Sequence, residues 1–361
     1  MSSLMAITDY LASIGCSFPD IGLLQPADPF LDTTGEDLRR RIFITTENSG
    51  AMLCLRPEFT IPVCLAHLQE GNGPARYAYG GSAFRQRRQE AAEFTQAGFE
   101  DLGNPDKRQA DIDCINIALE TVKAGGVNSP KLVLGNQFVF MTLLEALDIP
   151  AAWRKKLARS FGDIDLLNAQ LAAMSQNGGS SLETLPDEIR KAIDGADGQA
   201  VEKAISERML ADGLPLIGGR TPAAIAARIV EKTQLGAMQL DAEKRAALDS
   251  FLQIDTGLDQ AADSIAAFEK SHSLSLPHAA ERLEAMNSGV SVNGADASFR
   301  ASFGRRLDYY TGLVFEIYRT GLDKPVIGGG RYDRLLTLLG AEKEIPAVGF
   351  AIWVDRLGGA A

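Results

Sequence analysis

The sequence predicts an α+β fold in which one antiparallel sheet, flanked by helices, is built from both ends of the chain. Residues 1–124 mix helix-like with strand-like patterns, and residues 295–361 return to strand-like patterns. Residues 125–294 are mostly helical in pattern and rich in Ala, Leu, Lys, Glu and Asp. Because this helical block splits two strand-rich blocks, it is interpreted as an insertion into a single sheet, whose final strands complete the early ones.

The first block is expected to contain three helices and two pairs of strands. Helical spacing indicates helices at 4–15, where Gly15 ends the pattern, at 60–71 and at 107–126. The expected strands cover 43–46, 51–55, 75–84 and 93–103.

The helical block has breaks at NGGSS, GADGQ and PLIGGR, and one helix is expected to begin with Thr221 as N-cap and Pro222 as first residue. Strands resume in the last block at 297–304, 311–319 and 347–353. Between them, the glycines at 328–330 precede a short helix. They are interpreted as a tight turn that needs positive φ, with a phosphate-binding loop as the weaker alternative.

Composition excludes several classes of protein. The 361 residues are 45% hydrophobic and 23% charged, which is typical of a globular chain with a large core. A net charge of −11 argues against non-specific nucleic-acid binding. The N-terminus has no basic region and no long apolar run occurs, so a cytoplasmic protein is expected without a membrane partner. Four scattered cysteines and three histidines fit neither disulfides nor a metal site, and no cofactor is predicted; the cysteines are expected in the core.

Polar side chains recur within the strand-rich blocks. LRPEFT carries Arg56, Glu58 and Thr60 at alternate positions, and EFTQAGFE carries Gln96 and Glu100. Alternation along a strand places such residues on one face. That face is either solvated and salt-bridged, or a ligand site. The residue types suit an amino acid such as histidine, because carboxylates and an amide receive an ammonium, Arg binds a carboxylate, and Glu with Tyr holds an imidazole.

Five segments resemble, in order and spacing, the signature segments of the histidyl-tRNA synthetase family, which has a class II aminoacyl-tRNA synthetase core. They are RPEFT, FR followed by EFTQAGFEDLG, RRLDYYTGLVFE, GGGRYDRLL and PAVGFAIWVDRL. Pro26 resembles the motif 1 proline of the dimer interface, FR to FED resembles motif 2, and GFAIWVDRL resembles motif 3. The resemblance covers residues 1 to about 124 and 295–361, and it implies a class II synthetase-like antiparallel sheet and a homodimer.

The resemblance also implies a histidine pocket. The implied residues are Glu58, Thr60 and Gln96 toward the amino group, Glu100 and Tyr310 toward the imidazole with Tyr309 nearby, and Arg305 near the carboxylate and α-phosphate.

Arg85 and Arg356 match the arginines that hold ATP in the family, but neighbouring positions depart from its pattern. After FR the loop QRRQEAAEF is shorter, with Arg87 where a glutamate is expected. Trp353 stands where motif 3 has a glycine against which the nucleotide lies. The indole is therefore expected to occupy the nucleotide space, and the arginines are expected to be remnants without a catalytic role.

Smaller departures point the same way. Arg306 replaces the glycine expected after Arg305, and Asp355 precedes Arg356 where Glu-Arg is usual. The sequence ends at Ala361, where the synthetases continue into an anticodon-binding domain, so no such domain and no tRNA substrate are expected.

With these departures, the sequence resembles the regulatory subunits of ATP phosphoribosyltransferase, which are relatives of the synthetases. The resemblance implies a non-catalytic subunit required by the short-form catalytic subunit in the first step of histidine biosynthesis, in homodimers within a larger hetero-oligomer. L-Histidine would be its ligand and would mediate feedback inhibition, an effect that requires unequal binding to two states.

Two other hypotheses remain open from the sequence. One is a histidine-activating ligase or a truncated synthetase-like adenylating enzyme, which would exchange pyrophosphate into ATP in the presence of histidine. The other is a dimeric scaffold without a ligand, whose melting temperature histidine would leave unchanged.

Overall fold

The computed structural model describes residues 3–71, 73–88, 90–175, 185–194, 198–212, 221–237, 240–292, 295–305 and 309–358. The chain divides into two compact units. The first comprises Met1–Leu143, Phe161–Asp163 and Ser250–Ala361, and it carries the strands. The second comprises Leu144–Ser160 and Ile164–Asp249 and is helical in its described parts.

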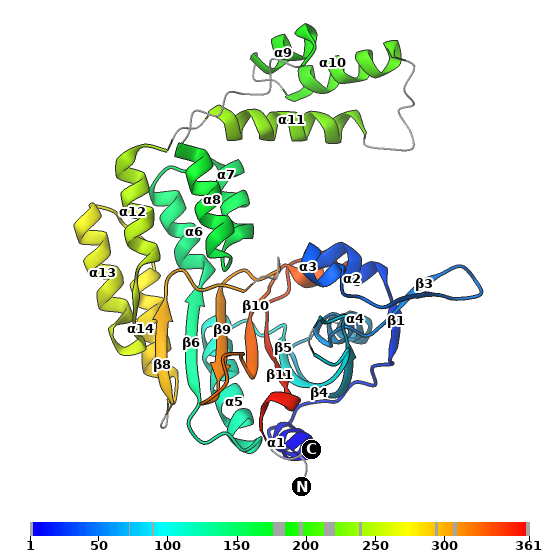
Figure 1. The fold of residues 1–361 in the computed structure, drawn as a ribbon, viewed down its shortest axis with the longest axis vertical. Coiled ribbons are helices and arrows are strands. Elements are labelled where there is room, and N and C mark those ends of the chain that lie inside the picture. The colour runs from blue at the N-terminus through cyan, green and yellow to red at the C-terminus, as the bar shows by residue number, and fades with distance from the viewer. Residues whose placement is uncertain are drawn as a thin grey trace. The chain divides into compact units, whose positions relative to one another are not determined.

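An eight-stranded sheet organises the described part of the first unit (Figure 1). In spatial order its strands are β4 (Ala75–Phe84), β5 (Glu93–Leu102), β11 (Ala347–Trp353), β10 (Ile327–Arg331), β9 (Leu313–Tyr318), β6 (Lys131–Asn136), β8 (Asp296–Arg300) and β7 (Asp255–Gly257). Neighbours are antiparallel except β6 and β8, which are parallel. The pairing of β5 with β11 confirms the prediction that both ends of the chain build one sheet.

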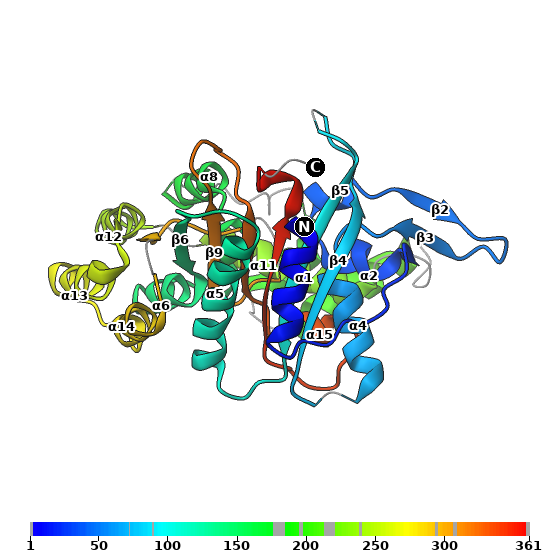
Figure 2. The same cartoon turned by 90° about the horizontal axis from the view of Figure 1, so that it is seen from below.

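Helices cover the sheet on both faces. Figure 2 shows α1 (Ser3–Ser13) beside α5 (Lys107–Ala124), and these helices pack on strands β4, β10 and β11. The carboxylate of Asp106 caps α5 by accepting the N–H of Gln109 at 3.0 Å. On the other face, α4 (Thr60–Glu70) contacts β5 and ends at Gly71, whose φ of 113° suits glycine. The sheet is therefore closed by α1 and α5 on one face and carries α4 beside its polar side chains on the other.

A smaller three-stranded antiparallel sheet belongs to the same unit. Its order is β1 (Leu24–Pro26), β3 (Met52–Leu55) and β2 (Ile44–Thr46), and β2 and β3 form the hairpin that projects in Figure 1. Pro26 lies at the end of β1, opposite Leu53. The helices α2 (Asp28–Thr33) and α3 (Glu36–Arg39) lie between β1 and β2 in the chain. The strands predicted at 43–46 and 51–55 are confirmed within one residue, whereas β1, α2 and α3 were not predicted.

The middle of the chain is mostly helical, as its composition predicts. The helices are α6 (Gln137–Ala146), α7 (Ala151–Ser160), α8 (Ile164–Ser175), α9 (Asp187–Asp194), α10 (Gly198–Ala211), α11 (Pro222–Ala237), α12 (Ala242–Leu252), the 3₁₀ turn η2 (Leu258–Gln260), α13 (Ala261–His272) and α14 (Ala279–Gly289). Thr221 caps α11 as predicted, because its hydroxyl accepts the N–H of Ala224 at 3.2 Å and Pro222 is the first helical residue. The predicted breaks at 177–181 and 215–220, and most of that at 195–199, lie outside the described residues.

Strands also occur within the range expected to be helical. Residues 131–136 form β6 in the middle of the sheet, and 255–257 form β7 at its edge. The sequence KLVLGN is a short apolar run, and periodicity cannot distinguish such a strand from part of a buried helix. The second compact unit begins at Leu144, after this strand.

The glycines at 328–330 form strand β10, so the prediction of a tight turn or phosphate loop was wrong. They are needed because neighbouring groups lie against the strand. A side chain on Gly328 would collide with the guanidinium of Arg305, and one on Gly329 would collide with the ring of Phe315. The short helix that follows is α15 (Leu335–Leu338).

Arg331, at the end of β10, joins the sheet to α5 through a buried ionic network. Its Nε donates to Asp111 Oδ1 at 2.8 Å and its Nη1 to Asp333 Oδ1 at 2.8 Å. Lys107 Nζ donates to Asp333 Oδ2 at 2.7 Å. Burial raises the pKa of Asp111 to about 6, although Arg331 opposes this shift. The charged residues of the GGGRYD segment therefore serve the fold.

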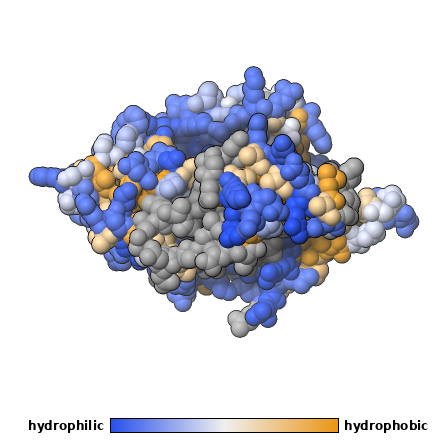
Figure 3. Space-filling model, turned by 90° about the horizontal axis from the view of Figure 1, so that it is seen from above, coloured by the Kyte–Doolittle hydropathy of each residue, from blue (hydrophilic) through white to orange (hydrophobic). Residues whose placement is uncertain are grey.

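The polarity of the visible surface and the burial of the cysteines agree with what the composition predicts. The coloured side chains on the face shown in Figure 3 are mostly hydrophilic. The four cysteines are buried and unpaired, as predicted. Among the described helices, none has the length and apolar character needed to cross a bilayer.

Candidate functional site

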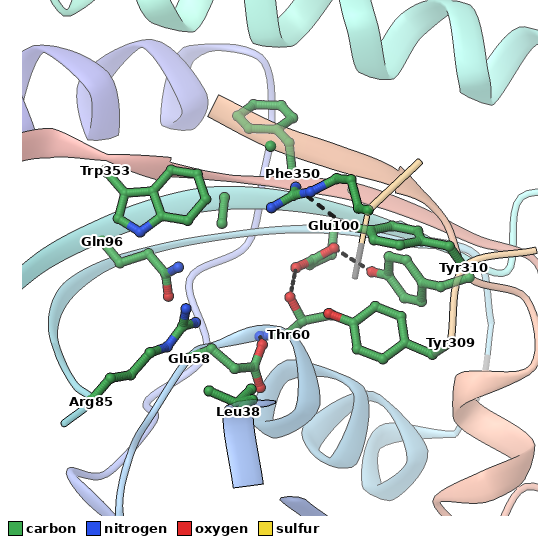
Figure 4. Close-up of a pocket in the computed structure, with 15 residues that line it drawn as sticks. Leu38, Glu58, Thr60, Arg85, Gln96, Glu100, Tyr309, Tyr310, Phe350 and Trp353 are labelled. Carbon is green, nitrogen blue, oxygen red and sulfur yellow. Dashed lines mark hydrogen bonds between the residues drawn. The ribbon is translucent and has the colours of Figure 1, made fainter. Parts of the chain in front are cut away.

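One small cavity on the β5–β11 face of the sheet gathers the polar residues that the sequence singled out (Figure 4). Its volume is about 60 Å³, which leaves room for only a few water molecules. Most of its polar walls are buried. From the predicted set it brings together Glu58, Thr60, Arg85, Gln96, Glu100, Arg305, Tyr309, Tyr310 and Trp353, and it adds Leu38, Gly328, Tyr332, Gly349, Phe350 and Ala351.

Glu58 lies just before α4 and caps that helix. Its Oε2 accepts the N–H of Thr60 at 2.7 Å and its Oε1 accepts the N–H of Ile61 at 2.9 Å. Burial raises the pKa of Glu58, while the Ile61 N–H and the charge of Arg85 oppose this shift. Each oxygen has used one of its two lone pairs, so both can still accept a hydrogen from a ligand.

Glu100, on β5, is the most connected polar group of the cavity. Its Oε1 accepts hydrogen bonds from the hydroxyls of Thr60 at 2.8 Å and Tyr79 at 3.3 Å, and its Oε2 accepts one from Tyr332. The Tyr79 hydroxyl is also 3.3 Å from the carbonyl of Phe350 and has one proton for the two acceptors, so Thr60 and Tyr332 are the undivided donors to Glu100. Oε2, which accepts from Tyr332, keeps a further position for a ligand. Gly349 makes room for this oxygen, because a side chain there would collide with it.

Burial raises the pKa of Glu100 from its ordinary 4.5 to about 8, against the lowering effect of the Tyr332 and Thr60 hydroxyls. The carboxyl group is thus mostly protonated at neutral pH. It can present either a proton or a lone pair to an imidazole nitrogen, and both are acceptable partners for that ring.

Gln96, also on β5, supplies an acceptor that has no partner within the described structure. Its side chain is 1% exposed and its Oε1 makes no hydrogen bond. A buried amide oxygen in this condition is costly, so it is suited to receive a donor such as an ammonium group. Figure 4 shows Gln96 and Glu58 pointing toward the same space.

Two arginines line the cavity from loops. Arg85 donates its Nε to the carbonyl of Pro57 at 2.7 Å, and burial lowers its pKa to about 10 despite the nearby carboxylate of Glu58. Arg305 lies across Gly328, with its Nη1 3.5 Å from the hydroxyl of Tyr310. Both remain cationic at neutral pH and can receive a carboxylate.

Trp353, the last residue of β11, forms the end wall of the cavity. Its backbone N–H donates to the carbonyl of Val326 at 2.9 Å, and its indole packs against Ala83 and Phe94. The guanidinium carbon of Arg356 lies 4.6 Å from the ring centroid. The indole is therefore a packed part of the structure.

A second, larger cavity of about 690 Å³ lies on the other side of Trp353. Its walls come from the β4–β5 loop, the β9–β10 loop and the end of β11. Three cations, Arg87, Lys324 and Arg356, pair there with the carboxylate of Glu90. The predicted ATP-handling residue Arg356 thus lies in this outer cavity, separated from the inner one by the indole.

Some predicted positions fall elsewhere. Arg56 was expected to share a strand face with Glu58 and Thr60, but β3 ends at Leu55 and the alternation does not apply. Its guanidinium instead donates to the carbonyls of Ile21 and Ser82. Arg306 lies outside the described residues.

Sequence reasoning missed Tyr79, Tyr332 and Leu38. Tyr332 sits in the quoted GGGRYD segment, where its place directly after a buried strand was the available signal. Tyr79 lies on β4 within an expected strand, and Leu38 comes from the unpredicted α3. Within the described parts of the chain, no group of three or more His, Cys, Asp or Glu is arranged to hold a metal ion.

Comparison with known sequences identifies relatives over nearly the whole chain. The sequence model of the family described as histidyl-tRNA synthetase matches residues 5–209 and 223–357. A protein from Brucella anthropi is 46% identical over 345 residues, covering 94% of this chain and 91% of its own. One from Mesorhizobium japonicum is 45% identical over 361 residues, covering 97% and 95%. Both are named ATP phosphoribosyltransferase regulatory subunit.

Solved structures share the fold. An ATP phosphoribosyltransferase regulatory subunit/histidyl-tRNA synthetase from Bacillus halodurans aligns with a TM-score of 0.68 at 19% identity, covering 98% of this chain and 77% of that one. A histidine–tRNA ligase subunit from Alicyclobacillus acidocaldarius aligns with a TM-score of 0.55 at 25% identity, covering 98% and 90%. The predicted class II synthetase-like α+β fold is confirmed.

The buried Glu100 carboxyl makes stability depend on pH in a defined direction. Because its pKa is raised to about 8, the folded protein keeps a proton that the unfolded chain loses near pH 4.5. Its contribution to stability is therefore fully present below pH 4.5 and is lost as the pH rises toward 8. We expect urea unfolding to show the wild-type free energy falling relative to that of Glu100→Gln between pH 5 and 8. Parallel curves would contradict the assignment.

Proposed function

The chain belongs to the family of ATP phosphoribosyltransferase regulatory subunits, which share the histidyl-tRNA synthetase fold, and we propose that it binds histidine and transmits feedback inhibition to the short-form catalytic subunit of that enzyme. In this role it is a non-catalytic partner that the catalytic subunit requires in the first step of histidine biosynthesis, and it works in the cytoplasm.

The observation that carries the histidine proposal is the set of unfilled acceptors in the inner cavity. The Oε1 of Gln96 has no partner, and the oxygens of Glu58 each retain a lone pair. Together they suit an ammonium group. The half-occupied Oε2 of Glu100 suits one imidazole nitrogen, and Arg305 suits a carboxylate. These three requirements describe a free amino acid with a ring that both donates and accepts hydrogen bonds.

The indole of Trp353 supports the proposal that no adenylate forms. Activation of histidine needs the α-phosphate of ATP beside the amino-acid carboxylate. The ring of Trp353 would lie between a nucleotide held by Arg356 in the outer cavity and a histidine in the inner cavity. The arginines that resemble ATP ligands are then remnants that hold the indole and the loops.

We also propose a homodimer that forms part of a larger assembly with the catalytic subunit. Exposed apolar side chains on the small sheet support a contact between two copies. Leu24, Ile44 and Met52 are 53%, 49% and 45% exposed. Ile44 and Met52 share one face, because Ile44 lies opposite Cys54 and Met52 is two residues from Cys54 on β3.

The first prediction concerns activity. A short-form catalytic subunit from the same organism should show ATP phosphoribosyltransferase activity only when this chain is added, and histidine should suppress it. Glu100→Ala and Tyr310→Phe should each raise the half-inhibitory histidine concentration at least about tenfold, the effect of losing roughly 1.4 kcal/mol of binding. Unchanged inhibition in both variants would place the histidine sensor on the catalytic subunit.

The second prediction concerns nucleotide. The wild-type protein should show no histidine-dependent exchange of pyrophosphate into ATP, whereas Trp353→Gly should bind ATP at least about tenfold more tightly by calorimetry, because the wall is removed. Retained histidine binding serves as the folding control, since loss of a buried Trp costs about 3–5 kcal/mol. Exchange by the wild-type protein, or no gain in ATP affinity, would refute the blocked site.

The third prediction concerns assembly. Ile44→Asp combined with Met52→Asp should convert a dimer into a monomer in size-exclusion chromatography with light scattering, because a charge at a contact core is costly. Leu338→Asp is the matched control, since Leu338 is 63% exposed and lies on α15, away from the small sheet. A double variant that stays dimeric would move the interface elsewhere.

A further inference from the structure

Arg305 reaches the histidine pocket from a loop, so something must fix the direction of its guanidinium. Its side chain is 13% exposed, and it rests on the bare backbone of Gly328. Glycine provides a floor but no side-chain partner. The orientation of the guanidinium in its plane therefore depends on the groups at its edges.

Glu316 occupies one of those edges. It lies on β9 directly opposite Gly328 of β10, and its Oε1 is 3.4 Å from Arg305 Nε. A carboxylate at the Nε edge leaves the Nη1–Nη2 edge directed into the cavity, where Nη1 lies near the hydroxyl of Tyr310. That second edge is the fork that binds a carboxylate through two parallel hydrogen bonds.

Tyr318 in turn fixes Glu316. It lies two residues further along β9, on the same face of the sheet, and its hydroxyl donates to Glu316 Oε2 at 2.6 Å. Burial raises the pKa of Tyr318, so the hydroxyl remains a donor throughout the neutral range. The two oxygens of Glu316 are thus divided between Tyr318 and Arg305.

We propose that Glu316 and Tyr318 are positioning residues that aim Arg305 at the α-carboxylate of the bound amino acid and so set the preference of the pocket for a free amino acid over its decarboxylated amine. The inference rests on the proposed histidine site. It assigns a role to two residues that make no contact with the cavity themselves.

Histamine separates this role from a general effect on folding, because it keeps the imidazole and amine of histidine but lacks the carboxylate. Calorimetric titration of the full-length protein with each compound gives the ratio of their dissociation constants. Glu316→Gln should reduce the preference for histidine about tenfold, and Tyr318→Phe about threefold, with the affinity for histamine unchanged within about twofold. The tenfold loss corresponds to about 1.4 kcal/mol, close to the lower end of the range for a hydrogen bond to a charged group.

Glu70 and Tyr77 provide a matched control. They form the same kind of pair, with the Tyr77 hydroxyl donating to Glu70 Oε2 at 2.9 Å, but this pair is not connected to Arg305. Glu70→Gln and Tyr77→Phe should keep the wild-type ratio. A ratio that stays unchanged in Glu316→Gln and Tyr318→Phe, or equal losses for both ligands, overturns the inference alone. Failure of the wild-type protein to bind histidine overturns the proposed function and this inference with it.

Discussion

The buried carboxyl of Glu100 is the group around which this site is assembled. A polar group so deep in a sheet is tolerated only with partners, and they come from three separate segments: Thr60 at the start of α4, Tyr79 on β4 and Tyr332 after β10. The hydroxyls tie α4, the neighbouring strand β4 and the end of β10 to β5. The carboxyl also lines the inner cavity, so the same contacts that stabilise the fold shape its wall.

Glycines in the neighbouring strands serve these polar groups. Gly349 on β11 leaves space for the Glu100 carboxyl, and Gly328 on β10 leaves space for the Arg305 guanidinium. The small residues of the last strand therefore accommodate side chains of this chain itself. Trp353, four residues beyond Gly349 on the same strand, instead fills the space beside the sheet with a large indole ring. Trp353 lines both cavities, so the change from bare backbone to a large ring marks the boundary between the inner and the outer cavity.

Much of the architecture could be predicted because its signals are local. The strands at 75–84 and 93–103 and the helix from 107 agree with the structure closely, and the β5–β11 pairing follows from the order of the blocks. The spacing of Gln96 and Glu100 on β5 was informative for the same reason. Strand β6 was missed because a six-residue apolar run has no distinctive period. Strand β10 was missed because its glycines are required by side chains that are distant in the sequence and pack against them. The role of Tyr332 depends on Glu100, 232 residues away, and its place after a buried strand marks the position without indicating that partner.

A pocket can regulate a partner only if its ligand binds two states of the assembly unequally. The inner cavity is small, at about 60 Å³, so the histidine binding proposed above requires its walls to adjust. The strands β5, β10 and β11 are tied by main-chain ladders, which makes them poor candidates for that movement. Arg305, Tyr309 and Tyr310 belong to the connection between β8 and β9, and further walls that no strand carries come from Leu38, Glu58, Thr60, Arg85 and Tyr332. Under the proposed function, the difference in the affinity of histidine for the two states sets the limit on how far it can shift the equilibrium of a complex.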